Sequence, residues 1–385
     1  MSLLMKTRGP CWRKCRCKDS GRKVGKRDRN MKKKAFRGKT IAALAALALV
    51  MEAVLLGSTA LERIRQAERE AELRAEGEKL KPSSWTEDNT LTLEGGLYGF
   101  DHRIETFLFM GTDASGSSDP QAFRGGMADF LLLMVLDHTD DAIGCIQIDP
   151  NTMTAVRELD TDISEITSRN LQICTAHWYG LTPEMAVGNT MYAVRQYLGG
   201  LVQIDGYFVM SIENAAALNH AVGGVEVTIE DDLDSADPAM VRGATVLLND
   251  EQVEIFLRAR QSVGGGTNAE RMARQRQYMA SFFSRVKQKT AEDAAFGLAL
   301  WNALKDAAVS DMNGNDFSRI AQKLIKGEDR GIVTVRGAVS QGDVLQDGML
   351  HEEFYPDAGA VRDAMTDLFS LIPLDGGNDT KEDEA

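Results

Sequence analysis

Residues 128–148, ADFLLLMVLDHTDDAIGCIQI, decide the fold of this 385-residue chain. Two apolar runs, 128–136 and 142–148, flank a polar turn at 138–141. Apolar residues at consecutive rather than alternate positions are typical of strands covered on both faces. The polar turn between the two runs predicts a hairpin. The stretch therefore indicates the centre of a sheet with another layer of structure on each side.

Further strands and helices are expected along the rest of the chain. Glycine pairs stop two of the helices, and Thr267 or Asn268 is expected to cap the longest one. This mixture predicts an α/β fold, a three-layer α-β-α sandwich with a central mixed sheet. The other expected strands are 106–111, 204–210, 225–229 and 332–335, and the expected helices are 183–198, 212–222, 249–257, 267–289, 292–308, 315–326 and 357–371.

The N-terminal part of the chain predicts a membrane anchor. Residues 1–39 carry 16 Lys/Arg and 2 Asp, a net charge of +14, which leaves −27 for the rest of a chain whose total is −13. Residues 41–61, IAALAALALVMEAVLLGSTAL, contain Glu52 as the only charged residue and have the length of one membrane span. Because the basic residues precede this stretch, the N-terminus is expected in the cytoplasm and the remainder outside the cell membrane.

Five segments follow from this organisation. They are a basic cytoplasmic tail (1–40), a transmembrane anchor (41–61), a charged stalk (62–90), an extracytoplasmic domain (91–372) and an acidic disordered tail (373–385). Two alternatives stay open. The apolar stretch could be a cleaved signal peptide with small residues at 58–60, and translation could start at Met31 instead of Met1.

Five arginines lie close together in residues 256–277, FLRARQSVGGGTNAERMARQRQ. On a helix that starts near Asn268, Arg271 and Gln275 flank the apolar stripe near the helix N-terminus, where backbone N–H groups attract anions. Arg258 and Arg260 would share a face if that segment is extended. Guanidinium groups suit phosphate, so these residues predict an anion site. The remaining two, Arg274 and Arg276, are interpreted as surface residues that pair with acidic side chains.

Two carboxylates are candidates for a metal site. Asp113 directly follows the apolar strand 106–111, and Asp129 lies at the start of the next apolar run. Mg²⁺ in proteins commonly binds one or two carboxylates and completes its shell with water and phosphate. The structural alternatives are solvation of a loop for Asp113 and capping of a strand for Asp129. Together with an anion site, the pair predicts Mg²⁺ with pyrophosphate.

The order of several stretches resembles the LytR-CpsA-Psr family. The resemblance covers about residues 107–289, and EFYPDAGAVRDAMTDLF extends it to near residue 371. The combined order is specific, although no single stretch is. The stretches are GTD (111–113), ADFLLLMV (128–135), NTMT (151–154), LNHAVGGVEVTIEDD (218–232), LNDEQVEIFLRAR (248–260) and TNAERMARQRQYM (267–279).

The resemblance implies a membrane-anchored, extracytoplasmic phosphotransferase of a Gram-positive-type bacterium. Such enzymes use Mg²⁺ to move a glycopolymer, for example teichoic acid or capsular polysaccharide, from polyprenyl pyrophosphate to peptidoglycan. By the resemblance, Asp113 and Asp129 are catalytic residues and metal ligands. It also implies that Arg258, Arg260, Arg271 and Gln275 bind the pyrophosphate and head group, and that an apolar pocket holds the lipid tail.

The chain departs from the family pattern at three places. The usual Arg-Asp pair falls on Pro150 and Asn151, an arginine two residues before Asp129 is Met127, and an acidic residue falls within 264–266. Arg124 or Arg157 could supply a lost charge. These departures leave a second hypothesis open, a catalytically impaired binding module or scaffold for lipid-linked wall polymers.

The aromatic cluster 177–179 is interpreted as packing, with sugar stacking as the alternative. Transcription regulation is disfavoured because the exported domain is acidic and has no basic recognition helix.

Overall fold

The computed structural model describes residues 90–93, 96–99, 103–113, 125–159, 166–200, 202–260, 266–342 and 351–374. The predicted cytoplasmic tail and anchor, all of the stalk except Thr90, and most of the acidic tail lie outside these residues. In the described ranges no helix combines the length and the apolar character that a membrane span needs. The domain predicted at 91–372 is described almost throughout, and its fold can be compared with the expectation.

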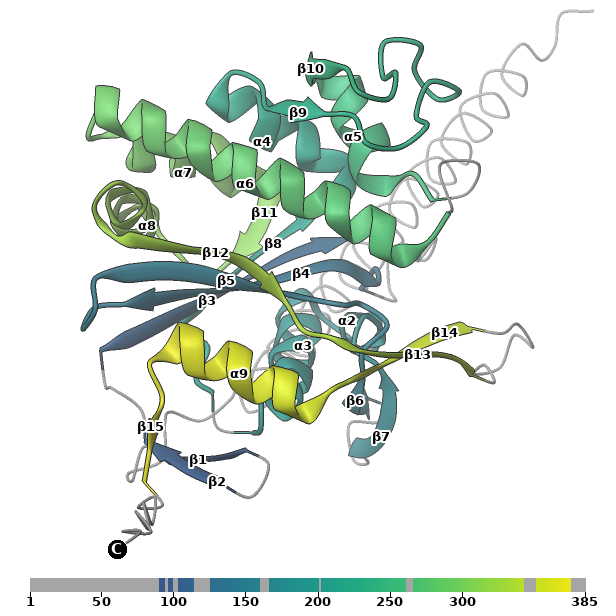
Figure 1. Cartoon of the computed structure of the whole chain (residues 1–385), viewed down its shortest axis with the longest axis vertical. Coiled ribbons are helices and arrows are strands. Elements are labelled where there is room, and N and C mark those ends of the chain that lie inside the picture. Colours follow the sequence, from purple (N-terminus) through teal and green to yellow (C-terminus); the bar gives the residue numbers. More distant parts are fainter. Residues whose placement is uncertain are drawn as a thin grey trace, which may run out of the picture. The chain divides into compact units, whose positions relative to one another are not determined.

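A six-stranded mixed sheet lies at the centre of the domain (Figure 1). The predicted hairpin is confirmed, because β4 pairs antiparallel with β5 at the middle of the sheet. β3 pairs antiparallel with β4, whereas β8 and β12 run parallel to β3 and β5. The strands in spatial order are β11 (Ala308–Ser310), β8 (Gly206–Ser211), β3 (Ile104–Thr112), β4 (Ala128–Asp137), β5 (Ala142–Ile148) and β12 (Glu328–Thr334).

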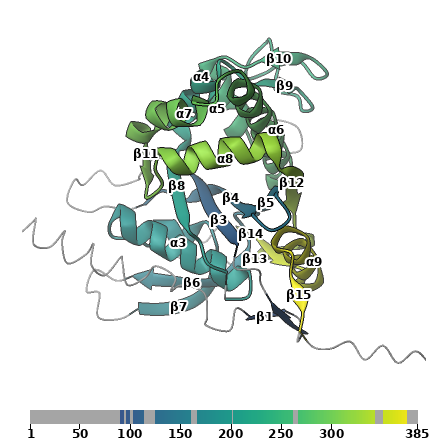
Figure 2. The same cartoon turned by 90° about the vertical axis from the view of Figure 1, so that its left-hand side faces the viewer.

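Helices cover both faces of this sheet, so the predicted three-layer sandwich is confirmed (Figures 1 and 2). Along β4, Leu132 and Met134 belong to one buried cluster and Leu131 and Leu133 to the other. This alternation explains the unbroken apolar run, since each face of the strand has its own core. One face carries α4 (Ala215–Val222), α5 (Asp250–Arg258), α6 (Asn268–Glu292), α7 (Phe296–Leu304) and α8 (Gly314–Lys326), and the other carries α2 (Thr175–Trp178), α3 (Pro183–Tyr197) and α9 (Ala358–Phe369).

The predicted helix starts are confirmed by their caps. Asn249 and Thr267 are the N-cap residues of α5 and α6, and each forms a capping box with the residue three positions later. Thr267, not Asn268, therefore caps the long helix. Asn268 is the first residue of α6 and is free to use its side chain elsewhere.

Several short ribbons outside the central sheet were not predicted. The predicted strand at 225–229 is the first strand of one of them, and the helix expected at 292–308 divides into α7 and a 3₁₀ turn, η2 (Lys305–Ala307). A second 3₁₀ turn, η1 (Ile212–Asn214), precedes α4. The ribbons are β1 (Thr90–Leu93) with β2 (Gly96–Gly99) and β15 (Ile372–Pro373), β6 (Met153–Leu159) with β7 (Ile166–Gln172), β9 (Glu226–Thr228) with β10 (Thr245–Leu247), and β13 (Gly337–Gly342) with β14 (His351–Pro356).

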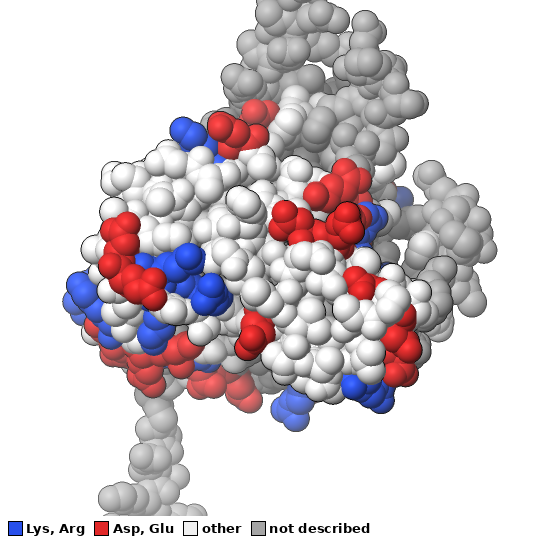
Figure 3. Space-filling view, turned by 90° about the horizontal axis from the view of Figure 1, so that it is seen from above, with Lys and Arg blue, Asp and Glu red and all other residues white. Residues whose placement is uncertain are grey.

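Charge is unevenly distributed over the helical face above the sheet. Seen from that side, groups that contain both acidic and basic side chains lie mainly toward the edges, and a broad, largely uncharged area lies between them (Figure 3). The basic groups in this view are local and have acidic groups beside them. This pattern differs from the continuous basic surface that nucleic-acid binding requires.

We expect Leu133→Ala to lower the free energy of unfolding by about 3 kcal/mol, because it removes a fully buried side chain from the central strand. The matched control is Leu298→Ala on α7, where the leucine is 48% exposed. The control should change stability by no more than about 0.5 kcal/mol. Urea unfolding followed by circular dichroism measures both, and equal effects would contradict the two-sided burial of β4.

Candidate functional site

A β-bulge turns Asp129 toward α6. Gly111 of β3 pairs with Phe130 of β4, and Thr112 pairs with Ala128, so Asp129 is the extra residue between two paired positions. Without the bulge, strict alternation would place Asp129 on the same face as Leu131, toward α3. Bulges of this kind redirect side chains near functional sites. The bulge lets the Asp129 carboxylate meet a helix on the opposite face.

Arg271 holds this carboxylate with two contacts. Its Nη1 lies 2.9 Å from Asp129 Oδ2, and its Nη2 lies 3.4 Å from Oδ1. The Arg271 side chain is only 5% exposed, compared with 24% for Asp129. A second hydrogen bond from Arg271 Nη2 to Asn268 Oδ1, at 2.8 Å, fixes the guanidinium on its own helix. The Nε atom of Arg271 is buried and has no hydrogen-bond partner in the described part of the chain.

Asp113 lies beside this pair at the end of β3. Its Oδ1 is 3.7 Å from Arg258 Nη2, and both side chains are about two-fifths exposed, so this contact is weak. Arg258 makes a shorter contact of 2.8 Å with Glu254. Burial raises the pKa of Asp113, and the nearby charge of Asp129 raises it further, while Arg258 and Arg271 oppose the shift. The two predicted carboxylates are therefore close enough for the charge of Asp129 to raise the pKa of Asp113.

Arg258 and Arg260 were expected to share a face only if the chain is extended there, and at Arg258 the chain is helical. Arg258 is the last residue of α5, and Arg260 lies two residues beyond it, so the two do not share the face of a strand. The charge of Arg260 contributes to lowering the pKa of Asp149, against the larger effect of burial. Arg258, Arg260 and Arg271 thus reach one region from a helix end, a loop and a helix start.

The prediction for Arg274 was confirmed for its acidic partner, Asp231, and was wrong for its position on the surface. Arg274 is not a surface residue but is buried between α5 and α6. Its Nε donates to the carbonyl oxygen of Phe256 at 2.9 Å, and its two other nitrogens contact Asp231 and the carbonyl oxygen of Ala259. Arg276 is half-buried and donates to Gln147 Oε1 at 2.9 Å. Arg274 therefore fixes the end of α5 against α6, and the anion site has three arginines.

Asp149 and Asn268 belong to the site although neither was predicted. Asn268 Nδ2 donates to Asp149 Oδ1 at 2.9 Å, which continues the chain of contacts from Asp129 through Arg271. Burial is the largest cause that raises the pKa of Asp149, and Arg271 and Arg260 oppose it. The signal was present in the sequence, because Asp149 follows β5 directly, as Asp113 follows β3.

Pro150 and Asn151, which replace the family's Arg-Asp pair, are integrated into the packing. Both are buried. Asn151 Nδ2 donates to Glu352 Oε1 of β14 at 2.9 Å, and Asn151 Oδ1 accepts from Gln172 at 3.3 Å. Arg157 does not replace a lost charge, because its guanidinium stacks on the Tyr192 ring of α3 at 3.7 Å. Arg124 lies outside the described residues.

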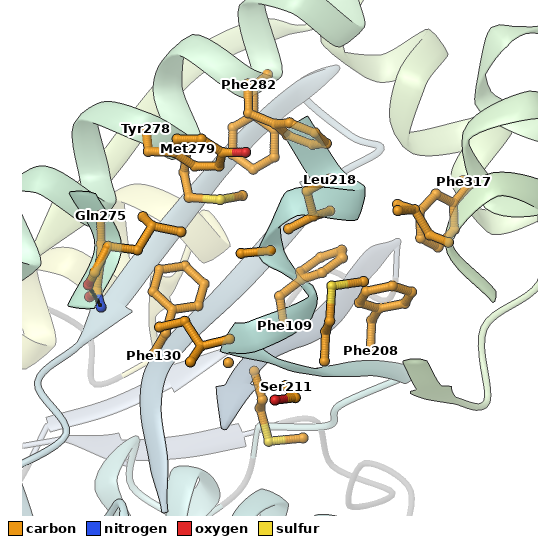
Figure 4. A pocket seen from close by; sticks show the side chains of 18 residues that line it. Phe109, Phe130, Phe208, Ser211, Leu218, Gln275, Tyr278, Met279, Phe282 and Phe317 are labelled. Carbon is orange, nitrogen blue, oxygen red and sulfur yellow. Dashed lines mark hydrogen bonds between the residues drawn. The ribbon is translucent and has the colours of Figure 1, made fainter. Parts of the chain in front are cut away.

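An apolar cavity opens beside the anion site on the α6 face (Figure 4). Its volume is about 100 Å³ with the side chains as they lie. Gln275 is at its edge and bonds to the carbonyl oxygen of Leu257 at 3.3 Å. The lining could not be predicted from the sequence, because nine helices and strands contribute to it. The lining includes Phe109, Phe130, Phe208, Met210, Ser211, Leu218, Tyr278, Met279, Phe282 and Phe317.

His177 is a packing residue that supports the carboxylates. Its ring Nδ1 lies 2.8 Å from the carbonyl oxygen of Gly126, and the side chain is buried. A Cβ at Gly126 would lie 2.0 Å from the carbonyl oxygen of Asp113, so only glycine fits this close approach. The next residue accepts a hydrogen bond at 3.0 Å from Asp113 N. The burial and the hydrogen bond of His177 therefore support its interpretation as a packing residue.

The donor set of the site suits a metal that shares its shell with a substrate. Within the described ranges, no group of three or more His, Cys, Asp or Glu side chains could hold a metal ion. Asp113 and Asp129 supply two carboxylates beside three arginines. Mg²⁺ commonly uses this arrangement, with phosphate oxygens and water as its other ligands.

Comparison with known proteins identifies the family of the chain. The family described as LytR_cpsA_psr matches residues 68–354, which is most of the chain. The chain belongs to the LytR-CpsA-Psr family. The sequence resemblance stated above is thereby confirmed. No curated protein matches this LytR-CpsA-Psr chain by sequence.

Solved structures share the fold of this LytR-CpsA-Psr protein at low identity. TagV of B. subtilis is 18% identical with a TM-score of 0.52, over 71% of this chain and 100% of TagV. Protein gbs0355 of Streptococcus agalactiae is 15% identical with a TM-score of 0.55, over 70% of this chain and 89% of that chain. TagT bound to LI-WTA is 13% identical with a TM-score of 0.50, over 74% and 97% of the two chains. These likenesses support the fold.

Protonation of His177 should destabilise the domain as the pH falls. Burial lowers the pKa of His177 to about 4, below the ordinary 6.5, so the unfolded chain binds the proton more tightly than the folded one. The stability contribution is complete above about pH 6.5 and is lost as the pH falls toward 4, by up to about 3 kcal/mol. Urea unfolding between pH 7 and 4.5 measures it. His177→Asn is the control, and an unchanged pH dependence in that variant would contradict the assignment.

Proposed function

We propose that this protein is a membrane-anchored, extracytoplasmic phosphotransferase that moves a glycopolymer from polyprenyl pyrophosphate to peptidoglycan. The observation that carries the proposal is the junction of an anion site with an apolar cavity. Arg271 at the start of α6 binds Asp129, and Gln275, one turn later on the same helix, is at the cavity edge. An amphiphile with an anionic head and an apolar tail matches both parts.

The three arginines support a pyrophosphate as the head group. Arg258, Arg260 and Arg271 lie on different elements, and the buried Nε of Arg271 has no hydrogen-bond partner among the described residues. A phosphate oxygen is a suitable acceptor for such a donor, because charge-assisted hydrogen bonds to guanidinium groups are among the strongest. The predominantly apolar cavity beside them suits an isoprenoid chain.

The proposed reaction is the displacement of a lipid phosphate. An acceptor hydroxyl attacks the phosphorus next to the sugar, the bond from that phosphorus to the lipid phosphate breaks, and polyprenyl phosphate leaves. The arginines stabilise charge on the phosphoryl oxygens, which is most of what such a transfer needs. Asp113 and Asp129 would hold Mg²⁺, which neutralises phosphate charge when it is bound. Arg271 keeps Asp129 oriented toward the site, and Asn268 keeps Arg271 in place.

The membrane location rests on the sequence and on the nature of the proposed substrate. The apolar stretch 41–61, with basic residues before it, predicts a single span with the domain outside. A lipid-linked substrate is confined to the membrane. An enzyme anchored in the same membrane encounters it by diffusion in the membrane plane. TagT, which shares the fold, has a solved structure bound to LI-WTA, and we infer a wall polymer as partner here by the same family membership.

A second candidate function is a binding module that holds the lipid-linked polymer without turnover. The observation that favours it is the pair Pro150-Asn151, which is buried and bonded to Glu352 and Gln172 rather than directed at the arginines. Opposing it, Arg258 contacts Asp113, Arg271 contacts Asp129, and the charges of Asp129 and Arg271 affect the pKa of Asp113. Turnover measurements separate the two functions.

We expect the full-length chain in detergent to release phosphate from a short-chain polyprenyl pyrophosphate only when Mg²⁺ is present. Arg258→Ala/Arg260→Ala should reduce this turnover at least 100-fold, because two of the three cations are lost. The matched control is Arg169→Ala/Arg242→Ala, which removes two exposed arginines outside the site. Binding without turnover in the unaltered chain would favour the binding module.

Restoring the family's Arg-Asp pair at positions 150 and 151 should not increase turnover by itself. Asn151→Asp would replace the donor to Glu352 with a second carboxylate, and Pro150→Arg would place a cation at a buried position. We therefore expect the double variant P150R/N151D to be less stable by about 2 kcal/mol. Adding Glu352→Gln should recover most of that loss. A large gain in turnover by P150R/N151D alone would indicate that the chain is an impaired transferase.

A further inference from the structure

A groove runs along one side of α6, above the edge of the central sheet. Its volume is about 550 Å³, which is within the range of small-ligand sites. Ala273, Ala280 and Lys287 line it at intervals of two helical turns, so one face of α6 forms its wall over about 20 Å. The floor comes from β4 and β5, and the opposite wall from β12 and α8 (Figure 1). The groove is therefore long and narrow.

This groove is separate from the apolar cavity beside the anion site. The cavity lies over β3 and β8, whereas the groove lies over β5 and β12. Gln275, Tyr278 and Phe282 line the cavity from α6, and none of them lines the groove. Of the residues of α6, which is described in full, Phe283 alone lines both. The helix itself therefore divides the two spaces.

The floor of the groove is apolar and belongs to the core on the α6 side of the sheet. Six apolar side chains in or against that one core contribute to the groove, and none of them belongs to the core on the α3 side. They are Met134, Ile143, Cys145, Phe283, Leu324 and Ile332. A hydrocarbon chain laid along this floor would remove apolar surface from water.

A β-bulge shapes the wall at β12. Asp329 pairs with Ile143 and Ile332 pairs with Cys145, so β12 has one more residue than β5 over this interval. Gly331, within the bulge, has a φ of 73°, which favours glycine. Strict alternation would turn Ile332 away from the face that carries Asp329, but the bulge lets both line the groove.

Arg276 brings a cation without a counter-charge to the groove. It is half-buried, and its Nη1 donates to the amide oxygen of Gln147 at 2.9 Å. Among the described residues no carboxylate forms an ion pair with it, and burial lowers the pKa of its guanidinium. A neutral amide does not compensate the charge, and a partly desolvated cation without compensation is costly. An anionic group in the groove would supply the missing charge.

The other charged residues of the groove limit that anion to a single charge. Lys287 lies eleven positions further along α6, about 16 Å from Arg276 along the helix axis, so the two cations cannot hold one head group. Glu230 and Asp329 are exposed residues of the lining and would repel a dianion. One guanidinium matches one carboxylate, with two parallel hydrogen bonds.

We propose that this groove binds a small aliphatic monocarboxylate, with its carboxylate at Arg276 and its hydrocarbon chain on the apolar floor. The site goes beyond the proposed function, because it uses none of the residues assigned to the donor and requires no transfer reaction. Both parts of the ligand are needed. A chain without the carboxylate leaves Arg276 uncompensated, and a carboxylate without the chain leaves the floor exposed to water.

The test measures binding of octanoate to the full-length chain in a neutral detergent by equilibrium dialysis. Octanamide has the same length without the charge, and acetate has the charge without the chain. Arg276→Gln removes the cation and keeps an amide that can bond to Gln147. Ala280→Trp fills the groove from an exposed position of α6. The matched controls are Arg169→Gln and Leu298→Trp, at exposed residues outside the groove.

We expect octanoate to bind about 10-fold more tightly than octanamide or acetate. Arg276→Gln should weaken octanoate binding about 10-fold, and Ala280→Trp should weaken binding of both octanoate and octanamide. The two controls should leave the Kd of octanoate within about 2-fold of that of the unaltered chain. Equal affinity for octanoate and octanamide, or equal affinity of Arg276→Gln and the unaltered chain, would overturn the proposal.

Competition distinguishes the groove from the site of the proposed reaction. Saturating short-chain polyprenyl pyrophosphate should leave the Kd of octanoate unchanged, because α6 lies between the two spaces. Displacement of octanoate would refute a separate site. Absence of octanoate binding to the unaltered chain would also refute the inference and would leave the transferase untouched. Circular dichroism checks the fold of each variant, and if Arg276→Gln does not fold, the comparison of Ala280→Trp with Leu298→Trp decides.

Discussion

The buried ion pair between Arg271 and Asp129 joins the two parts of the domain on which the site depends. Asp129 belongs to the central hairpin, and Arg271 to the long helix that covers it. A buried guanidinium is costly unless its donors are satisfied. Here Asp129 and Asn268 satisfy two nitrogens, and Asn268 continues the contacts to Asp149. The ends of two neighbouring strands, β4 and β5, are thereby connected to the first turn of α6.

Close backbone packing supports the same residues from the opposite side. Gly126 lies against the backbone of Asp113 with no room for a side chain, and the buried His177 ring holds its carbonyl oxygen. Arg274 fixes the end of α5, from which Arg258 reaches Asp113. The charged groups therefore rest on buried supports as well as on one another. A site built in this way keeps its geometry when a charged substrate enters, because none of the supports needs to move.

The sequence predicted those features that depend on local pattern. The hairpin at 128–148 was found because burial on both faces leaves an unbroken apolar run, and α5 and α6 were found because Asn249 and Thr267 are capping residues. Asp113 and Asp129 were found by their positions at strand ends. Features that depend on distant contacts were missed. The burial of Arg274 requires Asp231 and the end of α5, and the bulge at Asp129 is visible only in the register with β3. The cavity lining comes from nine elements, so no single local pattern in the sequence marks it.

The placement of Arg271 and Gln275 on one helix has a consequence for which donors can be used. Four residues of an α-helix span about 6 Å, and a helix packed along its length does not stretch. The distance between Arg271, which contacts the carboxylate, and Gln275, at the edge of the apolar cavity, is therefore constant. Under the proposed function, that separation admits one phosphate between the lipid and the phosphorus under attack. Lipids with a shorter bridge, such as the monophosphate that remains after transfer, would not span it, so the product would be released while the next donor is retained.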